Sequence, residues 1–186
     1  MFIQSPKSLG EIFDDQHMST HVQYYSESDV GSRPDFEDVV ACYRIWKEFC
    51  GDRPAPLRTH LKPERFGKLL NHLVLLDVLE GGGDFRYVIF GALHERHYGD
   101  RLTGRRLSEL GTAGGPAEPI LDLFRQCVAD CVPIWHVLFY LSVMKTVKAA
   151  QGCIMPLVDD DGRVTSMLGA SSFNDFPRTL LPAPLS

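Results

Sequence analysis

Two histidines and a tyrosine gather where a predicted strand turns into a short helix, and no other group in the chain is better suited to bind a small molecule. The stretch FRYVIFGALHERHYGDRLTG occupies positions 85–104. Its first six residues are typical of a strand, Gly91 breaks that strand, and a helix-prone piece with His94, His97 and Tyr98 follows. Such a strand, glycine and crowded short helix often wall a small cavity in a sensory domain. The stretch carries no catalytic signature.

The two histidines leave three interpretations open. His94 and His97 are spaced i, i+3 and can share one face of a helix. Metal sites usually need three or four protein ligands, and no third is signalled nearby in the sequence, although Glu95 lies between the two. We therefore expect packed histidines or a direct ligand contact rather than a metal or a haem.

The cysteines give little sign of chemistry. There are five, an odd number, and no two form a CxxC pair, which is typical of reduced thiols in the cytoplasm. Cys127 and Cys131 lie one turn apart on the apolar face of a predicted helix. Core packing is the favoured interpretation of this pair, and a redox or metal pair is the alternative.

Basic and acidic clusters are better explained as surface features. One arginine cluster flanks the Gly99 and Gly104 turns, and a second lies near Trp46; each could bind a carboxylate or phosphate, but solvated charges are the simpler interpretation. The acidic run 159–161 before Gly162 predicts a hairpin turn, because the Glu that a calcium loop needs does not follow. The arginines concerned are Arg96, Arg101, Arg105 and Arg106 in the first cluster, and Arg53, Arg58 and Arg65 in the second.

Composition limits the classes of protein to consider. The 186 residues are 44% hydrophobic and carry a formal net charge of −5, enough apolar side chains for one core and no overall basic charge. We therefore expect no nucleic-acid partner. The longest apolar run, 132–144, is shorter than the ~20 residues of a membrane span, so we expect no membrane insertion, and the first residues do not resemble a signal peptide. These features predict a cytoplasmic protein.

Periodicity predicts the order of elements. Residues 1–33 lack a sustained period and are expected to be a flexible arm, and 177–186 a loose tail. The ordered domain, 34–176, should begin with a helix over 35–50 and continue with two strands, a short helix, a long helix over 117–131 and three more strands. Tight turns between strands imply an antiparallel sheet, and hence an α+β fold. One face of the first helix is apolar: Phe36, Val39, Val40, Tyr43 and Trp46.

The predicted strand 134–143 favours a covered sheet. Alternation sends Trp135, Val137 and Phe139 to one face and His136, Leu138 and Tyr140 to the other, and both sets are large and fairly apolar. An antiparallel sheet open to solvent would alternate with polar residues. Either the helix over 35–50 or a second subunit should therefore cover the outer face, and the second possibility predicts a homodimer.

An ordered set of residues gives the chain a resemblance to the PAS domain family, and within it to bacterial stand-alone PAS-like proteins of unassigned function. The set spans roughly positions 39–173 and comprises Trp46, Arg53-Pro54, Arg58, Pro63, Leu75-Leu76-Asp77, Phe85-Arg86, Gly91, Tyr98-Gly99, Leu102-Thr103-Gly104, Val132-Pro133 and Met155-Pro156-Leu157.

The resemblance implies a five-stranded antiparallel sheet with helices cupping one face, plus the additional N-terminal helix. PAS domains commonly hold a small molecule in that cup or dimerise through the sheet and an N-terminal helix. No kinase, cyclase or DNA-binding segment is attached, so the resemblance implies output through an unknown partner protein. Light-sensing relatives use a cysteine within a polar motif for flavin chemistry, and no such motif surrounds any cysteine here, so we expect no photoreceptor. The resemblance leaves the cofactor unknown.

The sequence thus predicts a non-enzymatic sensory or regulatory module. A ligand-free homodimeric interaction scaffold is the alternative, and an enzyme ranks below both, because no nucleophile or acid–base set stands out. The candidate ligand-binding residues combine an aromatic body with a polar tip, as small-molecule pockets often require: Tyr87, His94, Tyr98, Trp135 and Tyr140.

Overall fold

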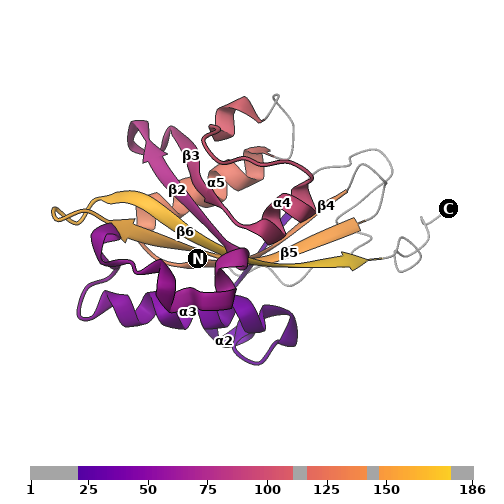
Figure 1. Cartoon of the computed structure of the whole chain (residues 1–186), viewed down its shortest axis with the longest axis horizontal. Helices are drawn as coiled ribbons and strands as arrows, with labels where there is room; N and C mark the ends of the chain where they lie inside the picture. Colours follow the sequence, from indigo (N-terminus) through magenta and orange to yellow (C-terminus); the bar gives the residue numbers. More distant parts are fainter. Residues whose placement is uncertain (1–20, 111–116, 142–146, 177–186) are drawn as a thin grey trace.

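A six-stranded antiparallel sheet forms the centre of the protein (Figure 1). The computed structural model describes residues 21–110, 117–141 and 147–176. The strands lie in the order β1-β4-β5-β6-β2-β3. Their bounds are β1 (His21–Tyr25), β2 (Leu73–Leu79), β3 (Asp84–Phe90), β4 (Ile134–Leu141), β5 (Val147–Val158) and β6 (Val164–Phe176).

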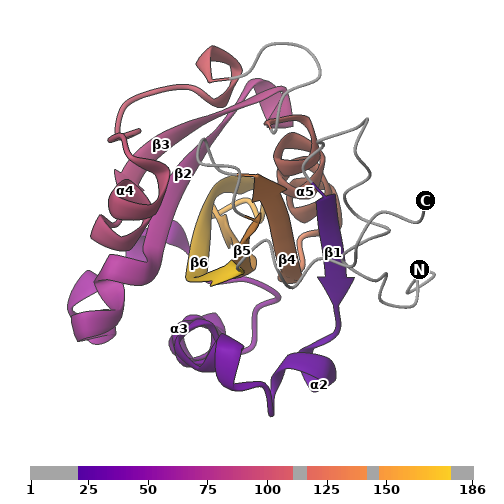
Figure 2. The same ribbon diagram turned by 90° about the vertical axis from the view of Figure 1, so that its right-hand side faces the viewer.

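Helices cover both faces of the sheet (Figure 2). On one face lies α3 (Glu37–Cys50), preceded by α2 (Glu27–Val30). The chain between β3 and β4, which includes α4 (Ala92–Tyr98) and α5 (Ala117–Asp130), covers the other face. Short 3₁₀ segments join these elements: η1 (Pro34–Phe36), η2 (Arg58–His60), η3 (Pro63–His72), η4 (Glu80–Gly82) and η5 (Leu107–Glu109).

The predicted α+β fold class is confirmed. Strands β2 to β6 form a five-stranded antiparallel sheet, in which β2 and β3 make one hairpin and β4, β5 and β6 follow one another as neighbours. The turn between β5 and β6 is built as the acidic run predicts. The Asp159 carboxylate accepts hydrogen bonds from the backbone N–H groups of Asp161 at 3.0 Å and Arg163 at 2.9 Å. That carboxylate therefore stabilises a turn.

The N-terminal helix α3 fills the face of the sheet on which it lies. Phe36, Val39, Tyr43 and Trp46 are buried there, while Val40 is half-buried at the edge of the same cluster. The Trp46 indole N–H donates to the Pro156 carbonyl oxygen at 3.0 Å. The chain's own helix thus covers this face. The apolar residues of β4 therefore do not indicate a second subunit.

Residues 21–30, which the sequence assigns to a flexible arm, form a strand and a short helix. Residues 21–25 form β1, which pairs antiparallel with β4 from His21↔Phe139 to Tyr25↔Trp135. Ser26 then caps α2 in a reciprocal arrangement with Asp29. Strand β1 is held at the edge of the sheet by backbone hydrogen bonds to β4. Such pairing leaves no periodic pattern of side chains in the sequence, so the strand was not predicted. Residues 1–20 and the tail 177–186 lie outside the described part of the chain.

Candidate functional site

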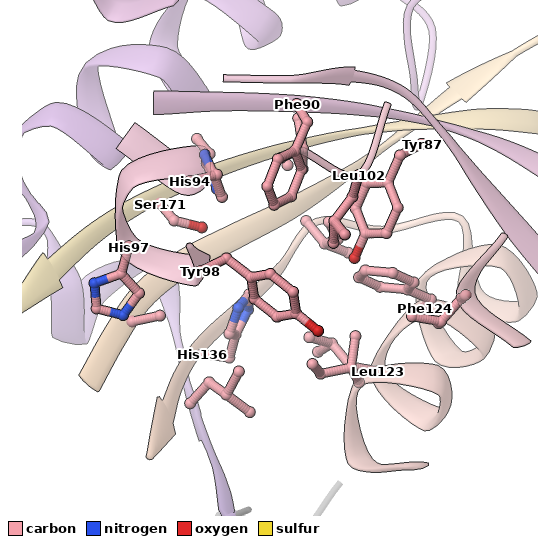
Figure 3. A pocket seen from close by; sticks show the side chains of 18 of the residues that line it. Tyr87, Phe90, His94, His97, Tyr98, Leu102, Leu123, Phe124, His136 and Ser171 are labelled. Carbon is pink, nitrogen blue, oxygen red and sulfur yellow. The ribbon is translucent and has the colours of Figure 1, made fainter. Parts of the chain in front are cut away.

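A cavity of about 190 Å³ lies between the sheet and the chain that includes α4 and α5 (Figure 3). Strands β2 to β6 and both helices contribute side chains to it. Most of the described lining is apolar, and the polar side chains come from two tyrosines, three histidines and one serine: Tyr87, His94, His97, Tyr98, His136 and Ser171 lie among Val74, Phe90, Leu102, Leu107, Leu110, Ile120, Leu123, Phe124, Leu138, Ala150, Cys153, Ile154, Gly169, Ala170 and Phe173.

Gly91 sets the position of α4. Its N–H donates to the Leu73 carbonyl oxygen at 2.9 Å, and a Cβ at this position would lie 2.5 Å from the Asn71 carbonyl oxygen. Only glycine fits this close approach. The predicted sequence of strand, glycine and short helix is therefore correct, and it directs His94 and Tyr98 toward the cavity.

His94 is a buried imidazole with one nitrogen left without a partner. Only 8% of the residue is exposed, and its ring lies 5.4 Å from that of Phe90 and 5.0 Å from that of Phe173. Within the described structure no hydrogen-bond partner reaches Nδ1. Burial lowers the pKa of His94 to about 3; nearby His72 and His97 act in the same direction, and a hydrogen bond with the Asn71 backbone opposes them. The side chain is therefore uncharged at neutral pH.

His136 reaches the cavity from the sheet, and the candidate residues did not include it. It is 7% exposed, and its Nδ1 lies 3.4 Å from the Ile134 carbonyl oxygen. A Cβ at position 152 would lie 2.5 Å from His136 Nε2, so Gly152 leaves the room that the ring occupies. Burial lowers the pKa of His136 to about 4, against a hydrogen bond with Ile134 that raises it. This imidazole is also uncharged at neutral pH.

Two tyrosines complete the polar lining. Tyr87 is 7% exposed and Tyr98 is 56% exposed, and in Figure 3 both hydroxyls point into the group of lining side chains. The ring of Phe90 lies between them. Its centroid is 5.1 Å from that of Tyr87 and 6.3 Å from that of Tyr98, both in edge-to-face geometry. Burial raises the pKa of Tyr87 above its ordinary value, so its hydroxyl keeps the proton. No hydrogen bond of the Tyr87 hydroxyl occurs within the described residues.

The structure brings three of the five candidate ligand-binding residues together. Tyr87, His94 and Tyr98 line the cavity. Trp135 does not: it lies on the opposite face, with its ring centroid 4.9 Å from that of Tyr43. Its assignment to the cavity was wrong, because alternation along β4 turns His136 inward and Trp135 toward α3. Tyr140 belongs to β4 by its backbone, and its side chain lies outside the described residues.

Most arginines of the two predicted clusters form ion pairs within the chain. Arg101, Arg105 and Arg106 form ion pairs with carboxylates, as do Arg58 and Arg65 of the second cluster. The five cysteines are free thiols. In the described part of the chain no three histidine, cysteine or acidic side chains gather as a metal site would require.

The cavity is small and has no carboxylate, lysine or arginine among its described lining residues. Its two deeply buried histidines are neutral. Clefts that hold drug-sized ligands measure ~300–1,000 Å³, whereas an apolar cavity of ~150 Å³ accepts benzene. A volume of about 190 Å³ therefore suits a compound with one ring.

The strand order also settles the type of fold. Five antiparallel strands in the order β4-β5-β6-β2-β3, with the β3–β4 connection cupping one face over a cavity, match what the resemblance implies. The fold is of the PAS type. Strand β1 and the covering helix α3 are additions to this PAS sheet. No helix of the described residues is long and apolar enough to span a membrane.

The chain is similar to several solved structures. No family model matches the sequence, and no curated protein matches it. Among solved structures, the dark structure of the blue-light photoreceptor Aureochrome1 LOV is 16% identical, with a TM-score of 0.45 over 62% of this chain and 83% of that one. The light-state dimer of the fungal blue-light photoreceptor Vivid is 12% identical, with a TM-score of 0.42 over 54% and 75%. An RNA-binding Light-Oxygen-Voltage receptor is 17% identical, with a TM-score of 0.43 over 62% of this chain, which spans 33% of that receptor.

Proposed function

We propose that the chain is a non-enzymatic sensory or regulatory module that binds a small molecule in this cavity and signals its occupancy to a partner protein. The observation that carries the proposal is the cavity itself, with a mostly apolar lining and, within the described residues, a buried histidine nitrogen, His94 Nδ1, that lacks a partner. Buried polar groups are nearly always hydrogen-bonded, and leaving one unsatisfied costs about 1–3 kcal/mol. A ligand that satisfies the Nδ1 atom of His94 would recover part of that free energy.

A route for the signal runs through β4 to the edge of the sheet. His136 and Leu138 line the cavity and pair in register with Tyr24 and Val22 of β1. A ligand that shifts β4 would therefore also shift β1, which continues into the α2 segment. The Tyr43 hydroxyl of α3 donates to Glu27 of α2 at 2.7 Å, so the movement would reach the helix on the opposite face. This outer segment is where we expect a partner protein to detect the ligand.

Native mass spectrometry of the purified full chain tests the proposal. We expect the wild-type protein to carry added mass from a small molecule, or to acquire it when toluene is supplied. Ala150 lines the cavity, and an Ala150→Leu variant should lose this binding because the larger side chain occupies the space. Ile89→Ala is the matched control, because Ile89 is 44% exposed and does not line the cavity.

The outcomes separate the two functions that the sequence leaves open. Binding that survives Ala150→Leu, with folding intact by circular dichroism, would contradict the cavity as the binding site. A wild-type protein that carries no small molecule, binds no toluene and runs as a dimer would instead support the ligand-free homodimeric scaffold.

A further inference from the structure

The two buried histidines of the cavity both present hydrogen-bond acceptors. A neutral imidazole has one N–H and one bare nitrogen, and its hydrogen-bond partners decide which is which. His136 Nδ1 faces the Ile134 carbonyl oxygen at 3.4 Å, and a carbonyl only accepts, so Nδ1 carries the hydrogen. The Nε2 atom, which lies over Gly152, is then the bare acceptor.

The same reasoning applies to His94. Its hydrogen bond with the Asn71 backbone favours the protonated ring, so the imidazole is the donor in that bond. Nδ1 has no hydrogen-bond partner in the described structure, so the donated hydrogen is the one on Nε2. Nδ1 is therefore a bare, buried acceptor. Two such acceptors call for a ligand that can donate.

The surrounding rings restrict the ligand further, as does the lack of carboxylate, lysine and arginine side chains in the described lining. Phe90 and Phe173 flank His94, and edge-to-face contacts link Phe90 to Tyr87 and Tyr98, so a flat ring would find favourable packing on several sides. No aspartate, glutamate, lysine or arginine among the described lining residues would pair with an ion, and burying an unpaired charge is strongly unfavourable. The occupant should be aromatic and neutral.

We propose that the cavity binds a small, uncharged aromatic compound that donates a hydrogen bond to a buried histidine, of which phenol is the simplest example. This inference rests on the proposed function and specifies the class of its ligand. The tyrosine hydroxyls can donate to the oxygen of the same compound, so one phenolic O–H can use both kinds of polar group. A volume of about 190 Å³ admits a single ring with a few further atoms.

Isothermal titration calorimetry of the full chain with three probes tests the assignment. Phenol supplies the donor, toluene has nearly the same shape without it, and benzoate adds a negative charge. We expect the wild-type protein to bind phenol about tenfold more tightly than toluene, as one hydrogen bond to a buried group predicts, and benzoate more weakly than either. His94→Leu and His136→Leu each remove one acceptor. At least one of them should reduce the phenol affinity to that of toluene and leave toluene binding unchanged.

Toluene binding also serves as the check on folding, because a variant that still binds toluene keeps its cavity. His60→Leu is the matched control, since His60 is exposed and lies outside the cavity. Equal affinities for phenol and toluene in the wild-type protein, or a preference for phenol that survives in both histidine variants, would overturn the inference and leave the proposed function standing. Tightest binding of benzoate would also overturn it. If no probe binds and the purified protein carries no small molecule, both proposals fail.

Discussion

The polar aromatic side chains on the two faces of the sheet differ in their hydrogen bonds. On the face covered by α3, the Trp46 indole donates to the Pro156 carbonyl oxygen and the Tyr43 hydroxyl donates to Glu27. On the face covered by α4 and α5, the buried Nδ1 of His94 has no hydrogen-bond partner among the described residues. Both faces bury large rings, so burial alone does not distinguish them. The difference is that these two polar groups of the α3 face are hydrogen-bonded within the chain, whereas, among the described residues, a buried nitrogen of a cavity-lining histidine is not.

This difference shows how one sheet can combine stability with binding. The α3 face has the features of a finished core, with stacked and edge-to-face rings of Tyr43, Trp46 and Trp135 at 4.9–5.8 Å. Gln151 is its one exception in the described part of the chain, because its buried Oε1 lacks a partner. The cavity face gives up packing contacts and hydrogen bonds that a ligand could restore.

Acid should destabilise the protein chiefly through the cavity face. The pKa values of His94 and His136 are lowered to about 3 and about 4 in the folded state, while an unfolded histidine titrates near pH ~6.5. Below pH ~6.5 the unfolded chain therefore binds more protons than the folded one. The free energy of unfolding should fall by roughly 1 kcal/mol per pH unit for each histidine until the folded-state pKa is reached.

Urea denaturation at pH 7, 6 and 5 measures this slope, and His136→Leu should reduce it by about half. The α3 face should contribute only at lower pH, because the hydrogen bond from Tyr43 lowers the pKa of Glu27 and that stabilisation is lost below the ordinary glutamate range. An identical slope in the wild-type protein and in His136→Leu would show that this histidine is not held neutral by the fold.

Two adjacent alanines on β5 offer a direct comparison of the faces. Ala149 belongs to the core beneath α3, and Ala150 lines the cavity. Ala149→Leu should destabilise the protein by about 1–3 kcal/mol, since extra carbon atoms have no space in a filled core. Ala150→Leu should change the stability by less than about 1 kcal/mol, because the cavity receives the side chain. Thermal and urea denaturation of the pair measures both values, and equal losses would show that the cavity does not exist as described.

Much of the fold could be predicted from the sequence because its signals are local. The helical period over 35–50 predicted α3 and its buried face, and the acidic run ending at Gly162 predicted the β5–β6 turn. The glycine at position 91 predicted the break between β3 and α4. In each case the residues that carry the signal also make the contacts that form the element.

The site could not be predicted fully, because it depends on contacts between residues far apart in the sequence. Alternation separated His136 from Trp135, but only the packing of α3 decides which set faces the cavity, so Trp135 was chosen and His136 was missed. Strand β1 was missed for a similar reason, because it is held by register with β4, more than a hundred residues away. The small residue at Gly152 was the one local sign of a bulky neighbour across the strand pair, and it identifies no partner by itself.

Removing one hydroxyl from each face gives the smallest and most specific comparison. Tyr43→Phe deletes the hydrogen bond to Glu27, which is 2.7 Å long and partly buried, and should cost about 0.5–1.5 kcal/mol. Tyr87→Phe deletes a hydroxyl that makes no hydrogen bond in the described structure, so the variant should be as stable as the wild-type protein or slightly more stable. Urea denaturation of both variants without ligand provides the test. A loss in Tyr87→Phe as large as that in Tyr43→Phe would mean that the cavity face satisfies its polar groups after all, and the contrast between the faces would then rest on the histidines alone.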